Sequence, residues 1–153
     1  MMVENSYGSR PDLLPGFVTA RHTDKRDQVL RLDLAASREL EAVTLNRFPA
    51  TFSAALDWDG APYEDRRWWD DEEDWARMAA ELLAPYVEEG RRVAIFWGNL
   101  VIPTVTMPAS VVVEHAREIL DVGPHFWIVP LEDSVLIECL MDGQVTVAAV
   151  PST

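Results

Sequence analysis

The chain has 153 residues, of which 48% are apolar and 25% charged, and its formal net charge is −13. This length fits one domain, which can bury roughly 70% of its unfolded surface without disulfides or metals. Nucleic acids attract Lys and Arg, so the acidic balance argues against direct nucleic-acid binding. No stretch resembles a secretory signal or a membrane span of about 18 apolar residues. Because Cys139 is the only cysteine, nothing indicates an oxidising compartment, and we expect a cytoplasmic protein.

The acidic residues are unevenly distributed along the chain. Residues 1–56 carry seven acids and seven bases, residues 57–89 carry twelve acids and three bases, and residues 90–153 carry seven acids and three bases. Negative charge favours solubility, which is one explanation. The other is a surface that steers a basic partner into contact.

The first third of the chain has the weakest pattern. Residues 1–16 contain prolines and glycines without periodicity, which predicts a flexible or extended arm before a single domain of residues 17–153. Residues 28–34 alternate like a half-exposed strand. A short helix capped by Ser37, or alternatively a strand, follows. Residues 51–60 alternate as a strand that ends at an Asp59-Gly60 turn, and residues 59–67 are expected to form turn and loop.

The strongest helix signal covers residues 70–88. Asp70 is the predicted N-cap, and Glu73 completes a capping-box pair. The apolar residues of this segment recur at helical spacing and form one face. Pro85 is expected to kink the helix or end it near residue 84, and Gly90 is a suitable final stop.

Residues 91–107 read as two strands joined by a two-residue turn at Gly98-Asn99. Both faces of the first strand are apolar, so it should be covered on both sides. Pro103 lacks a donor, which places the second strand at an edge or at a bulge. A second helix is predicted over residues 108–121. Its run of three valines weakens the helical pattern, and Gly123 ends it.

The C-terminal part predicts three more strands, one over residues 124–130 and two that flank an Asp142-Gly143 turn. The order from residue 70 is therefore α-β-β-α-β-β-β. This order indicates an α+β fold with a mainly antiparallel sheet, packed by the helices at 70–88 and 108–121. The N-terminal third is left open to add strands.

Several groups of residues invite a metal or catalytic interpretation. The acids at 70–74 lie on successive helical positions that point in different directions, so a solvated helix start is the preferred reading. Asp57 and Asp59 fit a turn better than a magnesium site. The histidines His22, His115 and His125 have no metal-binding spacing. We predict no metal and no cofactor.

The chain contains no nucleophile elbow, P-loop or dinucleotide fingerprint. Cys139 alternates with Ile137 in a strand and reads as a buried apolar residue, although a nucleophile paired with a distant histidine stays open. Glu138 is a single carboxylate without a predicted catalytic partner. Whether the chain is an enzyme stays open, and a non-catalytic protein is the preferred interpretation.

Four of the six tryptophans fall in the acidic segment. Trp75 lies on the inner face of the predicted helix, and Trp68, one heptad earlier, continues that face. Two readings of the remaining aromatic residues stay open. All of them belong to the core, or Trp58, Tyr63 and Trp69 line a surface patch of the kind that binding hot spots use.

We therefore predict a small acidic protein-binding module, most concretely an immunity-type inhibitor of a basic, nucleic-acid-acting toxin. The predicted partner-binding residues are Asp57, Trp58, Asp59, Tyr63, Trp69, Asp70, Asp71, Glu72 and Glu73. An alternative is a ligand-binding protein or enzyme with a pocket between sheet and helices. Trp97, Phe126 and Trp127 would line that pocket, with His115, His125 and Glu138 as its polar groups. A further alternative is an accessory subunit of a larger assembly.

Overall fold

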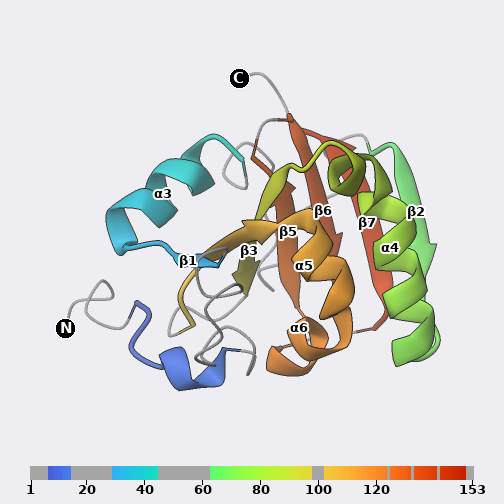
Figure 1. Ribbon diagram of the computed structural model, residues 1–153, viewed down its shortest axis with the longest axis horizontal. Coiled ribbons are helices and arrows are strands. Elements are labelled where there is room, and N and C mark those ends of the chain that lie inside the picture. Colours follow the sequence, from blue (N-terminus) through green and yellow to red (C-terminus); the bar gives the residue numbers. More distant parts are fainter. Residues whose placement is uncertain are drawn as a thin grey trace.

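The computed structural model describes residues 7–14, 29–44, 63–97, 102–123, 125–131, 133–140 and 142–150. In chain order these residues form a 3₁₀ turn, strands and helices (Figure 1). The elements are η2 (Pro11–Leu13), β1 (Leu30–Arg31), α3 (Leu34–Ala42), β2 (Asp65–Trp68), α4 (Glu72–Glu88), β3 (Arg92–Trp97), β4 (Val105–Pro108), α5 (Ala109–Glu114), α6 (Ala116–Val122), β5 (Phe126–Pro130), β6 (Val135–Cys139) and β7 (Gln144–Ala149).

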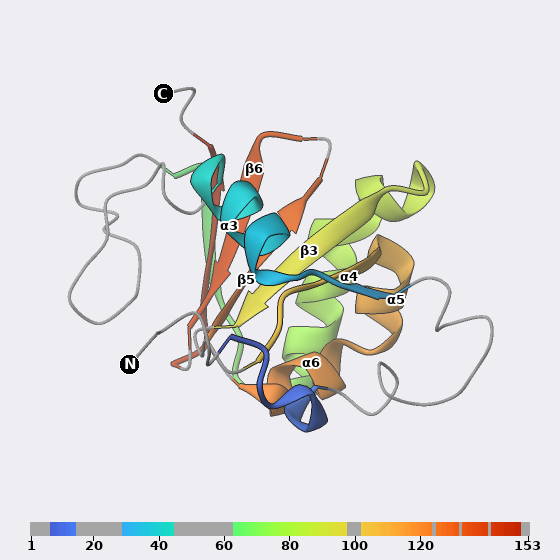
Figure 2. The same ribbon diagram turned by 90° about the vertical axis from the view of Figure 1, so that its left-hand side faces the viewer.

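The described strands form one seven-stranded sheet in the order β1-β4-β3-β5-β6-β7-β2, and every neighbouring pair is antiparallel. Helices α4, α5 and α6 cover one face, which we call the helical face, and α3 lies on the opposite side of the sheet (Figure 2). The predicted α+β class and the predicted element order from residue 70 are therefore confirmed.

Strand β3 is buried on both of its faces, as predicted. Val93, Ile95 and Trp97 belong to the larger core on the helical face, whereas Ala94 and Phe96 belong to a second core on the opposite face. On the helical side, Trp75 of α4 joins the helices to the sheet. Its Nε1 donates to the Ala116 carbonyl at 2.9 Å, and its ring meets the Phe126 ring edge-to-face at 5.6 Å.

The N-cap of helix α4 lies one residue later than predicted. Asp71 is the N-cap, and its Oδ1 accepts from the Asp74 backbone N–H at 2.8 Å. Asp74 Oδ2 in turn accepts from the Asp70 N–H at 3.0 Å. The cap is thus Asp71, and Asp74 accepts from the residue before the cap, so the prediction of Asp70 with Glu73 is wrong by one residue.

Pro85 does not end α4, which continues to Glu88. The stop lies at Gly90, as predicted, where the backbone adopts φ +66°. The Arg91 N–H donates to the Tyr86 carbonyl at 2.9 Å, and the Gly90 N–H donates to the Val87 carbonyl at 3.1 Å. These two bonds are those of a Schellman motif, which requires a left-handed residue at this position.

The second predicted helix is divided into α5 and α6 at His115. The three valines of residues 111–113 stand just before the division, and β-branched residues favour helices weakly. Gly123 follows α6 directly, as predicted.

Gly98 and Asn99, the residues of the predicted turn, lie outside the described residues. The register of the flanking strands differs from the one that an uninterrupted ladder from this turn would give. A two-residue turn at 98–99 would pair Ile95 with Ile102, but Ile95 pairs with Val105. Pairing begins after Pro103, which has no N–H to contribute to the ladder. Strand β4 is also not an edge, because β1 pairs with its other side.

The chain before residue 70 adds two strands and a helix, of which β1 and α3 lie in the N-terminal third. Strand β1 contains only two residues of the longer strand predicted at 28–34. Helix α3 is capped by Asp33 instead of Ser37, whose hydroxyl lies 2.8 Å from that of Thr104. The strand predicted over 51–60 lies outside the described residues, and β2 occupies part of the expected loop at 59–67.

Within the predicted arm, the described residues 7–14 contact the domain. Tyr7 Oη donates to the Leu32 carbonyl at 2.7 Å and accepts from the Thr104 N–H at 2.9 Å. Leu14 is buried in the core. In the described part of the chain, no helix combines the length and the apolar character that crossing a bilayer requires.

Candidate functional site

Three of the predicted partner-binding residues, Asp57, Trp58 and Asp59, lie outside the described residues, so their roles stay predictions. Tyr63 stands just before β2 and is 44% exposed. The guanidinium carbon of Arg66 lies 4.1 Å from the centre of its ring, a cation–π contact. Tyr63 therefore belongs to the surface of the edge strand β2.

The structure reverses the expected positions of Trp68 and Trp69. Trp68 is 57% exposed, whereas Trp69 is partly buried and packs against the core of the helical face. The prediction extended the helical spacing of Trp75 backwards to Trp68. Residues 65–68 are instead a strand, in which side chains alternate between the two faces, so it is Trp69 that turns towards α4.

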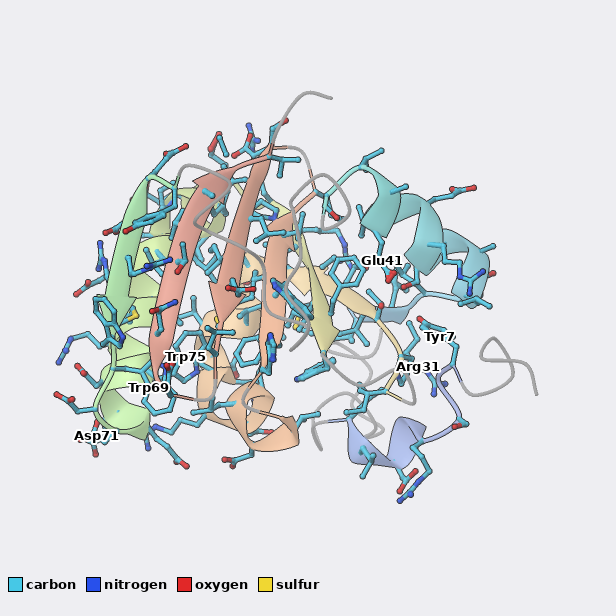
Figure 3. The ribbon with its side chains drawn as sticks, turned by 180° about the vertical axis from the view of Figure 1, so that it is seen from behind. Tyr7, Arg31, Glu41, Trp69, Asp71 and Trp75 are labelled. Atoms are coloured by element: carbon cyan, nitrogen blue, oxygen red, sulfur yellow. The ribbon has the colours of Figure 1, made fainter. Side chains whose placement is uncertain are left out.

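The four remaining predicted residues, Asp70, Asp71, Glu72 and Glu73, are exposed at the start of α4. Figure 3 places Asp71 at the same end of the molecule as Trp69 and Trp75. As the N-cap, Asp71 has a structural role of its own, and the helix dipole favours any anion in this first turn. The capping contacts involve Asp71 and Asp74, so Glu72 and Glu73 are not needed for them.

Packing of α4 against α5 and α6 extends this acidic surface well beyond the predicted segment. Residues 70–89 and 109–122 together carry eleven acids but only two arginines, Arg77 and Arg117. Arg77 is bound to Asp74, and Arg117 lies 3.9 Å from Glu73. We call this surface the acidic layer. Its exposed acids are Asp70, Asp71, Glu72, Glu73, Glu81, Glu88, Glu89, Glu114, Glu118 and Asp121.

A hollow of about 440 Å³ lies in the acidic layer at the division between α5 and α6. His115 stands in it, with Nδ1 2.7 Å from Glu118 Oε1 and Nε2 3.6 Å from Glu114 Oε1. Sequence reasoning missed Glu114 and Glu118 as members of this surface, because about forty residues separate them from the acidic run. The i, i+3 spacing of His115 and Glu118 on a predicted helix was the available signal.

The alternative pocket between sheet and helices does not form as predicted. Trp97 and Phe126 face the helices, whereas Trp127 and Glu138 belong to the opposite face of the sheet. Neighbouring residues of a strand point to opposite faces, so Phe126 and Trp127 do not line one cavity. His115 lies in the acidic layer, away from both.

Instead, the opposite face carries a row of polar residues across four strands. Glu138 is fully buried, and its Oε2 accepts from Trp127 Nε1 at 3.0 Å. Its cross-strand neighbour Thr146 is also buried, and Thr146 Oγ1 accepts from Arg66 Nε at 3.1 Å. These bonds satisfy groups whose burial would otherwise be costly. In the sequence, the charge of Glu138 within an otherwise apolar strand was the feature that could have predicted this polar row.

His125 lies beside this row, with its ring 4.7 Å from that of Trp127. Burial lowers the pKa of His125, and the nearby Glu138 carboxylate partly offsets this shift. Its Nε2 is buried and has no hydrogen-bond partner among the residues described. Burial, reinforced by Glu138, raises the pKa of the Cys139 thiol well above its usual range. Cys139 is thus a protonated core residue, as preferred from the sequence.

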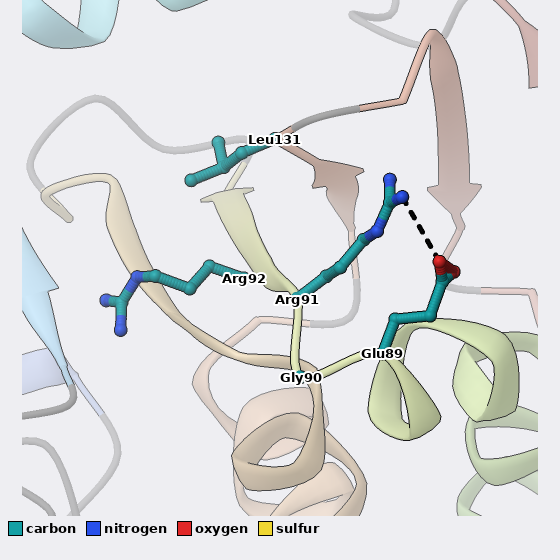
Figure 4. A pocket seen from close by; sticks show the side chains of 5 residues that line it. All are labelled: Glu89, Gly90, Arg91, Arg92 and Leu131. Carbon is teal, nitrogen blue, oxygen red and sulfur yellow. Dashed lines mark hydrogen bonds and ion pairs between the residues drawn. The ribbon is translucent and has the colours of Figure 1, made fainter.

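A second hollow, of about 430 Å³, lies between the end of α4 and the start of β3 and is lined by Glu89, Gly90, Arg91, Arg92 and Leu131. The two arginines point apart (Figure 4). Arg91 binds both Glu89, at 3.1 Å, and Asp133, at 2.8 Å. Arg92 donates to the Thr106 carbonyl at 3.1 Å. The polar groups therefore do not converge on one point, as a ligand site would require.

Among the described residues, no group of three or more His, Cys, Asp or Glu side chains is arranged to hold a metal ion. Searches against protein-family models and against curated proteins found no match.

Proposed function

We propose that this chain is a non-catalytic protein-binding module whose acidic layer docks on a basic protein. The concrete form is an immunity-type inhibitor of a basic toxin that acts on nucleic acid. The observation that carries the proposal is the gathering of eleven acids and only two arginines in residues 70–89 and 109–122, which contain helices α4, α5 and α6.

The needs of the fold account for only part of this charge. Capping explains Asp71 and Asp74, and the helix dipole favours anions in the first turn of α4 and, at Glu118, in the first turn of α6. Glu81, Glu88 and Glu114 lie outside those turns. Like charges on neighbouring helices repel one another, so the layer weakens its own packing, and a basic partner would relieve this repulsion.

An acidic surface of this kind suits the inhibition of a nucleic-acid-acting protein. The basic cleft of such a protein attracts phosphates, and a surface dense in carboxylates competes for the same arginines and lysines. Long-range attraction also raises the association rate, by an amount that falls as salt screens the charges. Binding that weakens as salt rises is therefore expected.

The experiment compares two variants of the full chain that lose the same number of charges. The first changes Asp70→Asn, Asp71→Asn, Glu72→Gln and Glu73→Gln, in which Asn still caps α4. The second, a matched control, makes four equivalent changes outside the layer, at Asp12, Asp33, Glu39 and Asp142. Wild type and both variants are used to capture proteins from the source cells and to protect cells that express the neighbouring reading frames.

We expect wild type and the control to retain the same basic protein, with the acidic-layer variant binding it at least about tenfold more weakly through slower association. Surface plasmon resonance at two salt concentrations measures this difference. The proposal is refuted if no basic protein is retained, or if the acidic-layer variant binds it as wild type does while urea titration shows all three chains equally stable.

A further inference from the structure

Strand β2 ends the described sheet with one open side. Figure 1 shows β2 at the outer edge of the molecule. The Trp69 N–H donates to the Gly143 carbonyl of the neighbouring chain segment at 3.1 Å. In an antiparallel ladder the residues that bond to a given neighbour alternate. Arg67 therefore also bonds towards β7, in the register observed. The alternation breaks before the strand, where the Glu64 N–H donates to the Val147 carbonyl at 2.7 Å. Within β2 the alternation directs the backbone N–H and C=O groups of Arg66 and Trp68 away from β7.

Large aromatic side chains flank these outward groups. Trp68 is 57% exposed and Tyr63 is 44% exposed, although both have large aromatic rings that burial would favour. Arg66 lies between them and is held on the opposite face by the Tyr63 ring and by Thr146 Oγ1. Exposed edges normally need protection against unwanted pairing. An edge with exposed aromatics is one that can receive another strand.

The charges around β2 favour a basic occupant. On the helical side of the strand, Arg67 is bound by Asp65 at 2.9 Å and by Glu81 at 2.8 Å, so its charge is already compensated. The acidic run begins two residues beyond Trp68. A second copy of the chain would bring its own net charge of −13 against the same surface, which like-charge repulsion opposes.

We propose that β2 receives an extended basic segment of the partner as an additional strand of the sheet. This inference rests on the proposed function, because it takes the partner to be a basic protein. Main-chain hydrogen bonds to Arg66 and Trp68 hold the segment. Its alternate side chains meet Trp68 on one face, and Asp65 with Glu81 on the other.

The test uses the ¹⁵N-labelled full chain and a defined probe, a seven-residue peptide of alternating Lys and Val. In the free protein the amides of Arg66 and Trp68 should exchange with solvent fast, and the Arg67 amide slowly. The peptide should slow exchange at Arg66 and Trp68 at least about tenfold. The control peptide has the same charge but carries N-methyl groups on alternate residues, which remove one edge of donors, and it should give no protection.

Two substitutions at one position separate the backbone from the side chain. Trp68→Ala removes the indole, whereas Trp68→Pro also removes the outward N–H, at an edge position that tolerates proline. The peptide should bind the proline variant about two- to tenfold more weakly than the alanine variant, the worth of one hydrogen bond. Equal urea midpoints for the two variants show that β2 is still folded. If the midpoints differ, Arg66→Pro tests the same prediction at the other residue whose N–H points outward.

The outcomes separate this inference from the proposed function. If both peptides bind equally and only the acidic-layer variant loses them, charge alone recruits the probe. Strand addition is then refuted while the proposed function stands. Absence of protection at Arg66 and Trp68 at millimolar peptide also refutes strand addition. If the amides of Arg66 and Trp68 are protected without peptide, and this protection grows with protein concentration, a second copy of the chain binds at β2. That result would refute a basic partner at this edge.

Discussion

Gly143 has a positive φ and lies close to the backbone of Trp69, so replacing it with alanine should destabilise the fold. Its backbone adopts φ +96°, in a region that side chains disfavour by roughly 1–2 kcal/mol. A Cβ at this position would also lie 2.6 Å from the Trp69 carbonyl oxygen, which belongs to the backbone and cannot swing aside. We expect Gly143→Ala to lower the free energy of unfolding by about 2–4 kcal/mol, the sum of the conformational penalty and the displacement of this segment.

Gly90 supplies the matched control for this substitution. It also has a positive φ, of +66°, but a Cβ there would meet nothing within 4 Å. Gly90→Ala should therefore cost only the conformational part, about 1 kcal/mol. Urea titration followed by far-ultraviolet circular dichroism gives both values, provided that the slopes agree. Equal costs for the two variants would refute the close approach of Trp69 and Gly143.

Three further predictions concern titratable groups. Because burial lowers the pKa of His125, the unfolded chain binds a proton more readily than the folded chain, and the free energy of unfolding should fall as pH drops below about 6.5. In His125→Gln the urea midpoint should fall less between pH 7 and pH 5 than in wild type. An equal fall in the two proteins would show that His125 is not the cause. Burial is the larger of two effects on Glu41 and raises its pKa against the opposing charge of Arg38, so wild type should gain stability as pH falls towards about 4.5. Glu41→Gln should be more stable than wild type at pH 7 and lose this gain, which thermal unfolding at both pH values tests. Cys139 is buried and its thiol stays protonated, so iodoacetamide should modify it only as urea unfolds the chain, and modification of the native protein at pH 8 would count against this burial.

The fold from residue 70 onwards could be predicted because its apolar pattern is strong. The helical spacing on the inner face of α4, the apolar residues on both faces of β3, and the Asp142-Gly143 turn between β6 and β7 each have one physical interpretation. The details that failed depend on contacts between distant segments. The β3–β4 register depends on where the ladder is interrupted by Pro103, which has no N–H to donate. The division at His115 depends on how α5 and α6 pack against α4.

The candidate site was only partly accessible from the sequence. The acidic run at 70–73 was visible as composition, but Glu114 and Glu118 join it through helix packing alone. Strand β2 was missed because Asp65, Arg66 and Arg67 show no apolar alternation. A strand at a sheet edge has little surface to bury, so its composition resembles that of a loop. The exchanged positions of Trp68 and Trp69 follow from that error.

The two ends of the sheet differ in a way that limits how the molecule can assemble. At one end β1 has only two residues, and the Tyr7 hydroxyl bridges the Leu32 carbonyl and the Thr104 amide beside it. At the other end of the described sheet, β2 offers four residues with no strand paired on one side. A head-to-tail filament needs two complementary ends on each molecule. With one receptive end in the described sheet, edge-to-edge association of these sheets has no second end from which to continue, so it does not grow into fibres.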